Sequence, residues 1–181
     1  DIPFSDRVTG VELELLIGMQ DAQVEDRAKY LPYTLPGPLL AWLDRSLVQG
    51  EVARAGFIWR GSTRRGNYPH MTVQLFLDAR DATLSYDPAW PTLTDLDATV
   101  WVDDGRTWGR ALTGRSEGAQ LSDLVVRVLP QSPGVLLDVQ GHVEGPASAA
   151  SVLLRDTPLR DLTNSVFADW RFTGALNGDL A

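Results

Sequence analysis

Pairs of closely spaced acidic residues are the side chains of this sequence that could perform acid–base chemistry. They are Asp78 and Asp81, Asp95 and Asp97, and Asp103 and Asp104. A glycoside hydrolase needs two carboxylates that face one cleft about 5–10 Å apart, and Asp95 and Asp97 share one face of a predicted strand. Asp103-Asp104-Gly105 is instead typical of a hairpin turn. We interpret these acids as turn residues and solvated residues of an outer sheet face, and keep a glycosidase as a distant alternative.

The sequence contains few residues of the types that other catalytic sites and metal sites require. Cysteine is absent, and His70 and His142 are the two histidines. Disulfides, Cys-ligated zinc and a thiol nucleophile are therefore excluded. The sequence also contains no P-loop, no G-x-S-x-G elbow and no H-E-x-x-H motif. We expect no enzymatic activity, no cofactor and no metal site.

Two groups of residues could bind a ligand without catalysis. Arg60, Arg64 and Arg65 could meet a lipid phosphate or another anion, although a basic loop of this kind is more often simply solvated. Trp101 and Trp108 flank a predicted hairpin, where exposed indole rings could form a platform that stacks against sugars.

Composition limits the class of protein. The chain has 181 residues, with 16 Lys and Arg against 24 Asp and Glu and a net charge of -8. This acidity disfavours nucleic acid as a partner. No apolar run reaches the roughly 18 residues that span a bilayer, and no signal segment is visible at the start. Because the sequence begins at Asp1 without Met and stops in what reads as an unfinished strand, we interpret it as a piece of a longer protein.

The pattern of apolar residues predicts a mainly β protein with minor α content. Alternation favours strands over residues 8–19, 51–60, 71–78, 82–86, 96–102, 107–113, 119–129, 135–143 and 168–181. Helical spacing predicts a helix over 38–48, a second over 146–166 that breaks near Pro158, and a short helical stretch within 20–30. The short spacing of the central strands predicts an antiparallel meander.

Nearly every predicted strand carries one continuous apolar row. Such a face must be covered by a second sheet, by helices or by a ligand with long hydrocarbon chains. From composition alone, an ordinary core is the favoured interpretation. The residues of these rows are Val11, Leu13, Leu15, Ile17, Met71, Val73, Leu75, Leu77, Leu84, Leu96, Val100, Val102, Leu124, Val126, Val128, Val135, Leu137, Val139 and Phe172.

Three sequence motifs resemble those of one protein family. The run Tyr86-Asp87-Pro88-Ala89-Trp90-Pro91-Thr92-Leu93, followed by a strand at Leu96, resembles a recurrent motif of the AsmA-like envelope proteins, specifically the YhdP family. Tyr30-Leu31-Pro32 followed by Leu43-Asp44 and Gly50 is similar to the same family. So is Val152-Leu153-Leu154-Arg155-Asp156-Thr157-Pro158-Leu159 followed by residues 170–174. The motifs keep the family's order over most of residues 8–181.

The resemblance implies a fold and a function. The fold is a curved antiparallel sheet, an open half-barrel or β-groove with two helical crossover segments, cut from a longer repeat array. The implied function is that of a bridge-like lipid transfer protein, anchored in the inner membrane of a Gram-negative bacterium and crossing the periplasm. Phospholipid acyl chains would lie on the apolar rows listed above on their way between inner and outer membranes, which would support outer-membrane lipid homeostasis and barrier function. The family has no catalytic residues.

The array implies three approximate units. Residues 1–50 would end one repeat with its helical crossover, residues 51–145 would form the central sheet, and residues 146–181 would begin the next repeat. An alternative of another class is a β-sandwich binding or scaffolding module. Its apolar rows would be a closed core, and its surface aromatics would contact glycan or a protein partner.

Overall fold

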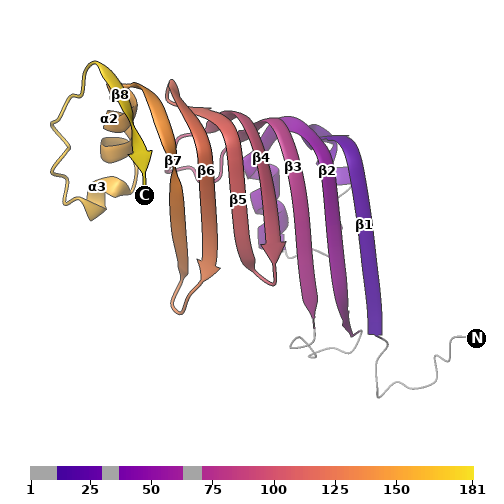
Figure 1. Cartoon of the computed structure of the whole chain (residues 1–181). Coiled ribbons are helices and arrows are strands. Elements are labelled where there is room, and N and C mark those ends of the chain that lie inside the picture. The colour runs from indigo at the N-terminus through magenta and orange to yellow at the C-terminus, as the bar shows by residue number, and fades with distance from the viewer. Residues whose placement is uncertain (1–11, 30–36, 63–70) are drawn as a thin grey trace, which may run out of the picture.

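One antiparallel sheet accounts for most of the chain. The computed structural model describes residues 12–29, 37–62 and 71–181. Within them, eight strands lie side by side in chain order (Figure 1). The strands are β1 (Glu12–Gln23), β2 (Leu47–Ser62), β3 (Thr72–Leu84), β4 (Leu93–Asp103), β5 (Arg106–Ser116), β6 (Ala119–Pro130), β7 (Val135–Pro146) and β8 (Ala175–Leu180).

Every strand pairs antiparallel with its chain neighbour, as the sequence predicts. The turn between β4 and β5 contains Asp104 and Gly105 at φ values of 44° and 86°. Asp and Gly tolerate this left-handed backbone, which a two-residue hairpin turn requires. The described strands form one open sheet, so the two-sheet core of a β-sandwich is not present among them.

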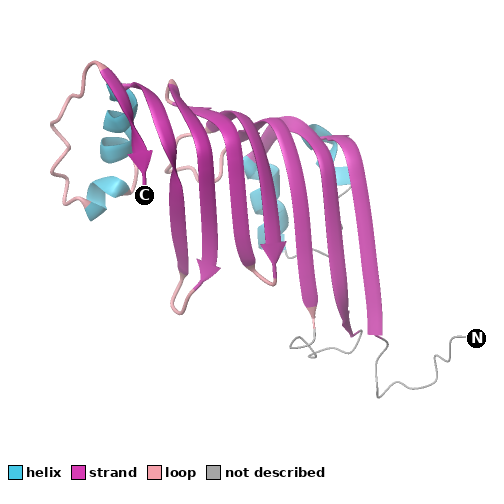
Figure 2. Cartoon of the chain, viewed as in Figure 1, coloured by secondary structure: helices cyan, strands magenta, loops and turns pink. Residues whose placement is uncertain are grey.

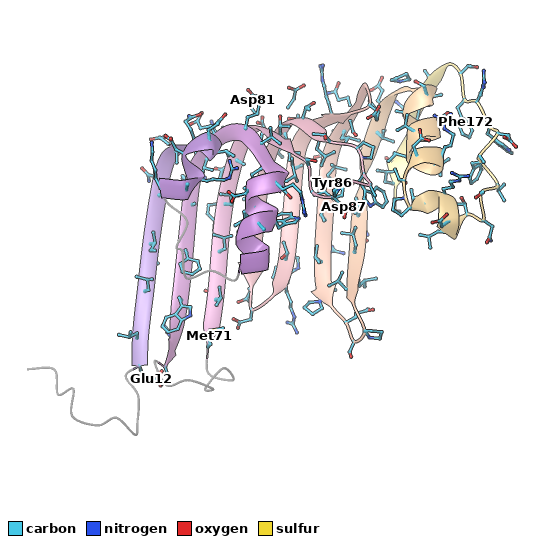
Figure 3. The ribbon with its side chains drawn as sticks, turned by 180° about the vertical axis from the view of Figure 1, so that it is seen from behind. Glu12, Met71, Asp81, Tyr86, Asp87 and Phe172 are labelled. Atoms are coloured by element: carbon cyan, nitrogen blue, oxygen red, sulfur yellow. The ribbon has the colours of Figure 1, made fainter. Side chains whose placement is uncertain are left out.

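A line of β-bulges bends the sheet. Asp21, Asp81, Asp95 and Asp123 all have φ between 47° and 51°. The antiparallel register shifts next to Asp81, Asp95 and Asp123. Bulges bend and twist the strand that carries them, and the upper ends of the strands fold over toward the side on which helix α1 lies (Figures 1 and 3). The sheet is therefore curved, as expected.

The helices connect neighbouring strands. The 3-10 helix η1 (Val24–Lys29) and α1 (Gly37–Ser46) lie between β1 and β2, and α2 (Ala147–Asp156) and α3 (Leu159–Leu162) lie between β7 and β8 (Figure 2). The expected helical segments exist, but each joins antiparallel neighbours and crosses no other strand.

The buried core lies inside the bend. Its larger cluster comprises Ala82, Leu96, Ala111, Ala119, Leu121, Leu124, Val143 and Ala149. Ala149 comes from α2, so this helix packs against the concave side of the sheet. A smaller cluster of Ala22, Val24 and Val52 places η1 on the same side, against Met19 and Leu77.

Several predicted boundaries were wrong. Residues 71–78 and 82–86 are one strand, β3, because the bulge at Asp81 interrupts the alternation without ending the strand. Residues 20–23 extend β1. The last strand covers 175–180 and not 168–181, because turns and extended loop fill the region before Gly174. The helical region predicted over 146–166 ends earlier, at Leu162, whereas its predicted break near Pro158 is confirmed, since α2 and α3 are separated at Thr157 and Pro158.

Candidate functional site: an apolar groove

Strand register places the apolar rows on one face of the sheet. Cross-strand partners point to the same side of an antiparallel sheet. Leu15 opposes Trp59, which opposes Val73; Leu75 opposes Val102. On the same face, the rows continue into the second half of the sheet, where Val102 opposes Thr107, Thr107 opposes Val128 and Val128 opposes Leu137. We call this surface, which faces the bend and the helices, the groove face.

Charged residues lie on the opposite surface, which we call the outer face. Below the bulges, the strands cover residues 12–20, 54–62, 72–79, 98–103, 106–111, 124–130 and 135–140. All charged side chains of these segments fall on outer-face positions in the observed register: Glu12, Glu14, Arg54, Arg60, Asp78, Asp103, Arg106, Arg110, Arg127 and Asp138. The groove face of the same segments carries no charge.

Ion pairs between directly opposed residues stabilise the outer face. Arg60 bonds Glu14 at 2.9 Å, and Arg127 bonds Asp138 at 3.0 Å. Both pairs are exposed, and such pairs each contribute about 0.2–1 kcal/mol. Their main consequence is to fix the register. A slip by one residue would turn every charged side chain into the groove.

The groove face is buried at the bend and open below it. Leu96 and Leu124 are in the core. Farther down the strands, Leu15 is 47% exposed and Leu137 is 54% exposed. Large aliphatic side chains that form a continuous, half-exposed surface are unusual on a soluble domain and mark a binding surface.

The structure brings most of the predicted lining residues together. Strands β1, β3, β4, β6 and β7 place them on the groove face in register: Leu13, Leu15, Ile17, Val73, Leu75, Leu77, Leu84, Leu96, Val100, Val102, Leu124, Val126, Val128, Val135, Leu137 and Val139. Met71 directly precedes β3 at its lower end (Figure 3). Val11 lies outside the described residues.

Phe172 was placed wrongly by the sequence pattern. It is not in a strand but in the loop before β8, beside α2 (Figure 3). Its ring packs at a tilt against Trp170, at a centroid distance of 5.8 Å, and its backbone N–H donates to Ser151 Oγ. The alternation of Trp170 and Phe172 therefore reflects an aromatic cluster and not a strand.

Two groove residues on β2 were missed. Phe57 opposes Ile17 and Leu75, and Trp59 opposes Leu15 and Val73. Residues 51–60 were predicted as a strand, but Gly56 and Ile58 blur the difference between its two faces. Pairing the predicted strands in register would have identified both aromatic residues.

A hydrogen bond ties α1 to the loop between β3 and β4. Trp42 Nε1 donates to the backbone oxygen of Tyr86 at 2.9 Å, and the rings of Tyr86 and Trp90 lie 6.3 Å apart. This loop begins where β3 leaves the bend, and Figure 3 shows Tyr86 and Asp87 in front of the strands on the groove side. Burial raises the pKa of the Tyr86 phenol above its ordinary value, and the Asp87 carboxylate raises it further.

The acids proposed for a glycosidase have structural roles. Asp95 sits at a bulge with φ of 50°, and Asp97 Oδ1 accepts the backbone N–H of Asp81 at 3.0 Å. Asp104 Oδ1 accepts the backbone N–H of Val73 at 2.8 Å. The carboxylates of Asp97 and Asp104 therefore hold a bulge and a strand end, and that of Asp95 pairs with Arg115.

The remaining candidates are dispersed. Arg60 is paired with Glu14, whereas Arg64, Arg65 and His70 lie outside the described residues. His142 Nδ1 lies 2.8 Å from Asp179 Oδ1 on the outer face. Among residues 12–29, 37–62 and 71–181, no group of three or more His, Asp or Glu side chains is arranged to hold a metal ion.

The part of the chain that the structure describes has no helix of the length and apolar character that crossing a membrane requires.

Comparison of the sequence with known proteins identifies a protein family. The sequence matches the YhdP protein family over residues 4–181. It is 26% identical over 172 residues to the intermembrane phospholipid transporter YhdP of Escherichia coli (strain K12). That alignment covers 93% of this chain and 13% of the relative. No solved structure gives a significant match. Because the family match extends over nearly the whole chain, the chain belongs to the YhdP family.

Proposed function

We propose that the groove face carries phospholipid acyl chains, and that this chain is a segment of a bridge that conducts phospholipid across the periplasm between inner and outer membranes. The observation that carries the proposal is the charge-free, half-exposed apolar face that extends from β1 to β7. Membership of a family that includes an intermembrane phospholipid transporter supports it.

The physical reason is the cost of exposing hydrocarbon to water. Each CH₂ moved into water costs about 0.8 kcal/mol, so a free phospholipid with two acyl chains crosses an aqueous space very slowly. A continuous apolar surface removes that cost at every point of the path. Because the surface offers similar contacts along its length, no single tight site traps the lipid, and no catalysis is needed.

The wider function follows from the same proposal. The segment would work as part of an inner-membrane-anchored protein of the bacterial envelope and would support outer-membrane lipid homeostasis. The proposed units are 1–50, 51–145 and 146–181. In the structure, the boundary near 50 follows α1 and the boundary near 145 precedes α2, which supports the view that helical segments separate groove units.

Site-specific photocrosslinking tests the lipid path. A photoreactive residue is placed at Leu75, Val100 or Leu137, which are on the groove face. The controls are Gln74, Thr99 and Asp138, which neighbour them in the chain and lie on the outer face. Mass spectrometry then identifies the adducts formed in cells.

We expect phospholipid adducts at the three groove positions and few at the controls. Equal adducts at neighbouring positions would mean nonspecific contact with membranes. Complete absence of lipid at all six positions would mean that the groove face is covered by protein, and the proposal would be wrong.

A further inference from the structure

The outer face contains a hollow that the lipid path does not use. Gly18 of β1 and Gly56 of β2 are directly opposed on this face. Above them lies an open hollow of about 540 Å³, which continues into a second hollow of about 380 Å³; both are lined by Gly56 and Phe76. We call this depression the glycine slot.

The two glycines have no structural reason to be glycine. Neither is among the residues with positive φ, and a Cβ atom built at either would meet nothing within 4 Å. Gly141 is different, since a Cβ there would lie 2.5 Å from Leu124 Cδ2. Glycine in the interior of a strand destabilises the strand. A strand glycine that the fold does not require often marks a place where a ligand or another backbone approaches closely.

The walls of the slot combine apolar rings with polar side chains. Leu16 and Ile58 occupy the neighbouring row on one side, and Gln20 and Arg54 the row on the other. Phe76 closes one end, and its ring lies 5.8 Å from that of Trp101. Trp101 is 42% exposed and Leu16 is 72% exposed, so a ligand can reach both from solvent.

The two charged residues that line the slot, Arg54 and Asp103, already have partners. Arg54 pairs with Asp78 at 3.1 Å, and Gln74 Nε2 donates to Asp103 Oδ1 at 3.0 Å. An anionic ligand would have to displace Asp78 from Arg54, and a cationic ligand would have to displace the Gln74 amide from Asp103. A neutral ligand could use the remaining hydrogen-bonding capacity of the amides and carboxylates while its C–H surface covers the rings.

We propose that the glycine slot binds a neutral saccharide. A pyranose has an apolar face of C–H groups and a rim of hydroxyls. The apolar face matches Phe76 and Trp101, and the hydroxyls match Gln20, Gln74 and Arg54 in the rows beside them. An acyl chain matches the slot less well than the groove face, because Gln20, Arg54 and Gln74 place polar groups in its wall, whereas the groove face below the bulges carries no charge. This inference does not rest on lipid transport, because the slot and the groove lie on opposite faces.

The test is binding of neutral oligosaccharides to the purified chain. The probes are chitotetraose, cellotetraose and maltotetraose at millimolar concentration, measured by saturation-transfer NMR and by tryptophan fluorescence. The blocking variants are Gly18→Val and Gly56→Val. Because a Cβ at either position meets open space, and because valine favours strands, both variants should fold with equal or greater thermal stability.

We expect at least one probe to bind saturably and both blocking variants to abolish binding. Trp101→Ala should weaken binding about tenfold, equivalent to about 1.4 kcal/mol. The matched control is Trp170→Ala, because Trp170 is 52% exposed but lies outside the sheet; it should bind normally. Lipid adducts at Leu75 should be unchanged in all blocking variants.

Three outcomes would overturn the proposal. No probe binds the folded chain; binding persists in the valine variants; or the valine variants instead change the oligomeric state in sedimentation, which would make the slot a contact between copies. None of these outcomes depends on lipid binding, so failure here is distinguishable from failure of the transport proposal.

Discussion

At the scale of single residues, aspartates at positive φ determine the shape of the groove. Left-handed backbone costs most L-residues about 1–2 kcal/mol, and Asp and Asn pay less than other residues because their short polar side chains bond locally. The bulges of β3, β4 and β6 place Asp81, Asp95 and Asp123 there, and Asp21 of β1 has the same backbone conformation. Two of the acidic residues that first suggested catalysis, Asp81 and Asp95, thus help to bend the sheet that forms the site.

Asp123 gives the cleanest test of this role. We expect Asp123→Ala to lower the free energy of unfolding by about 1 kcal/mol, because a backbone φ of 51° is less favourable for alanine than for aspartate. Asp123→Asn and Asp123→Gly should leave it within experimental error, since both tolerate this conformation. Urea denaturation measures all three. Equal losses for Ala, Asn and Gly would show that the carboxylate itself matters and not the backbone.

Residue patterns predicted the groove face but not the bulges. The alternation of Leu75 and Leu77 or of Leu137 and Val139 identifies the rows, because a half-buried strand repeats every two residues. A bulge adds one residue and inverts the alternation beyond it, so β3 was predicted as two strands around Asp81. The concave side could not be deduced from the sequence, because it depends on the joint direction of several bulges.

At the scale of elements, close approach between β6 and β7 keeps the bend packed. Gly141 lies against Leu124, whose Cα would be 3.0 Å from an added Cβ, and Ser122 O would be 3.2 Å away. Gly145 is crowded in the same way by Ala119. The buried Ala149 then places α2 over this region. Small residues therefore permit β6 and β7 to approach closely beside the bulge at Asp123.

Alanine substitutions at Gly141 and Gly18 compare a crowded glycine with an uncrowded one. We expect Gly141→Ala to destabilise the protein by about 1–3 kcal/mol, the usual cost of overpacking. Gly18→Ala should have little effect or a small stabilising one, because its Cβ meets open space. Thermal denaturation of the two variants measures the difference. A Gly141→Ala variant as stable as Gly18→Ala would show that β6 and β7 can move apart.

Elements were predicted more reliably in the middle of the chain than at its ends. Between residues 93 and 146 the strands are joined by short turns, and each turn has a local sequence signal. Before β8, Trp170 and Phe172 alternate like a strand but pack on each other beside α2. Their position follows from the packing of α2 and the loop, which a local pattern does not reveal.

At the scale of the whole molecule, the sheet separates an apolar surface from a charged one. The register puts a charge-free surface inside the curve and the ion pairs outside it. Because the bulges of β3, β4 and β6 bend the sheet across its strands, the groove axis runs from β1 toward β8. A lipid that follows this axis would contact side chains from many strands in turn. Its movement would therefore depend on an apolar surface that is continuous from strand to strand.

A single charge in the middle of the groove tests that continuity. Val100 of β4 lies between Leu75 of β3 and the rows of β6 and β7. We expect Val100→Asp to reduce phospholipid adducts at both Leu75 and Leu137 by about tenfold or more, because removing a hydrated carboxylate from water costs well over 1.4 kcal/mol. The control is Thr99→Asp, which adds the same charge on the outer face of the same strand and should leave both adducts unchanged. If Val100→Asp removed the adduct at Leu75 and spared that at Leu137, the groove would consist of separate lipid sites, and transport along one continuous path would be contradicted.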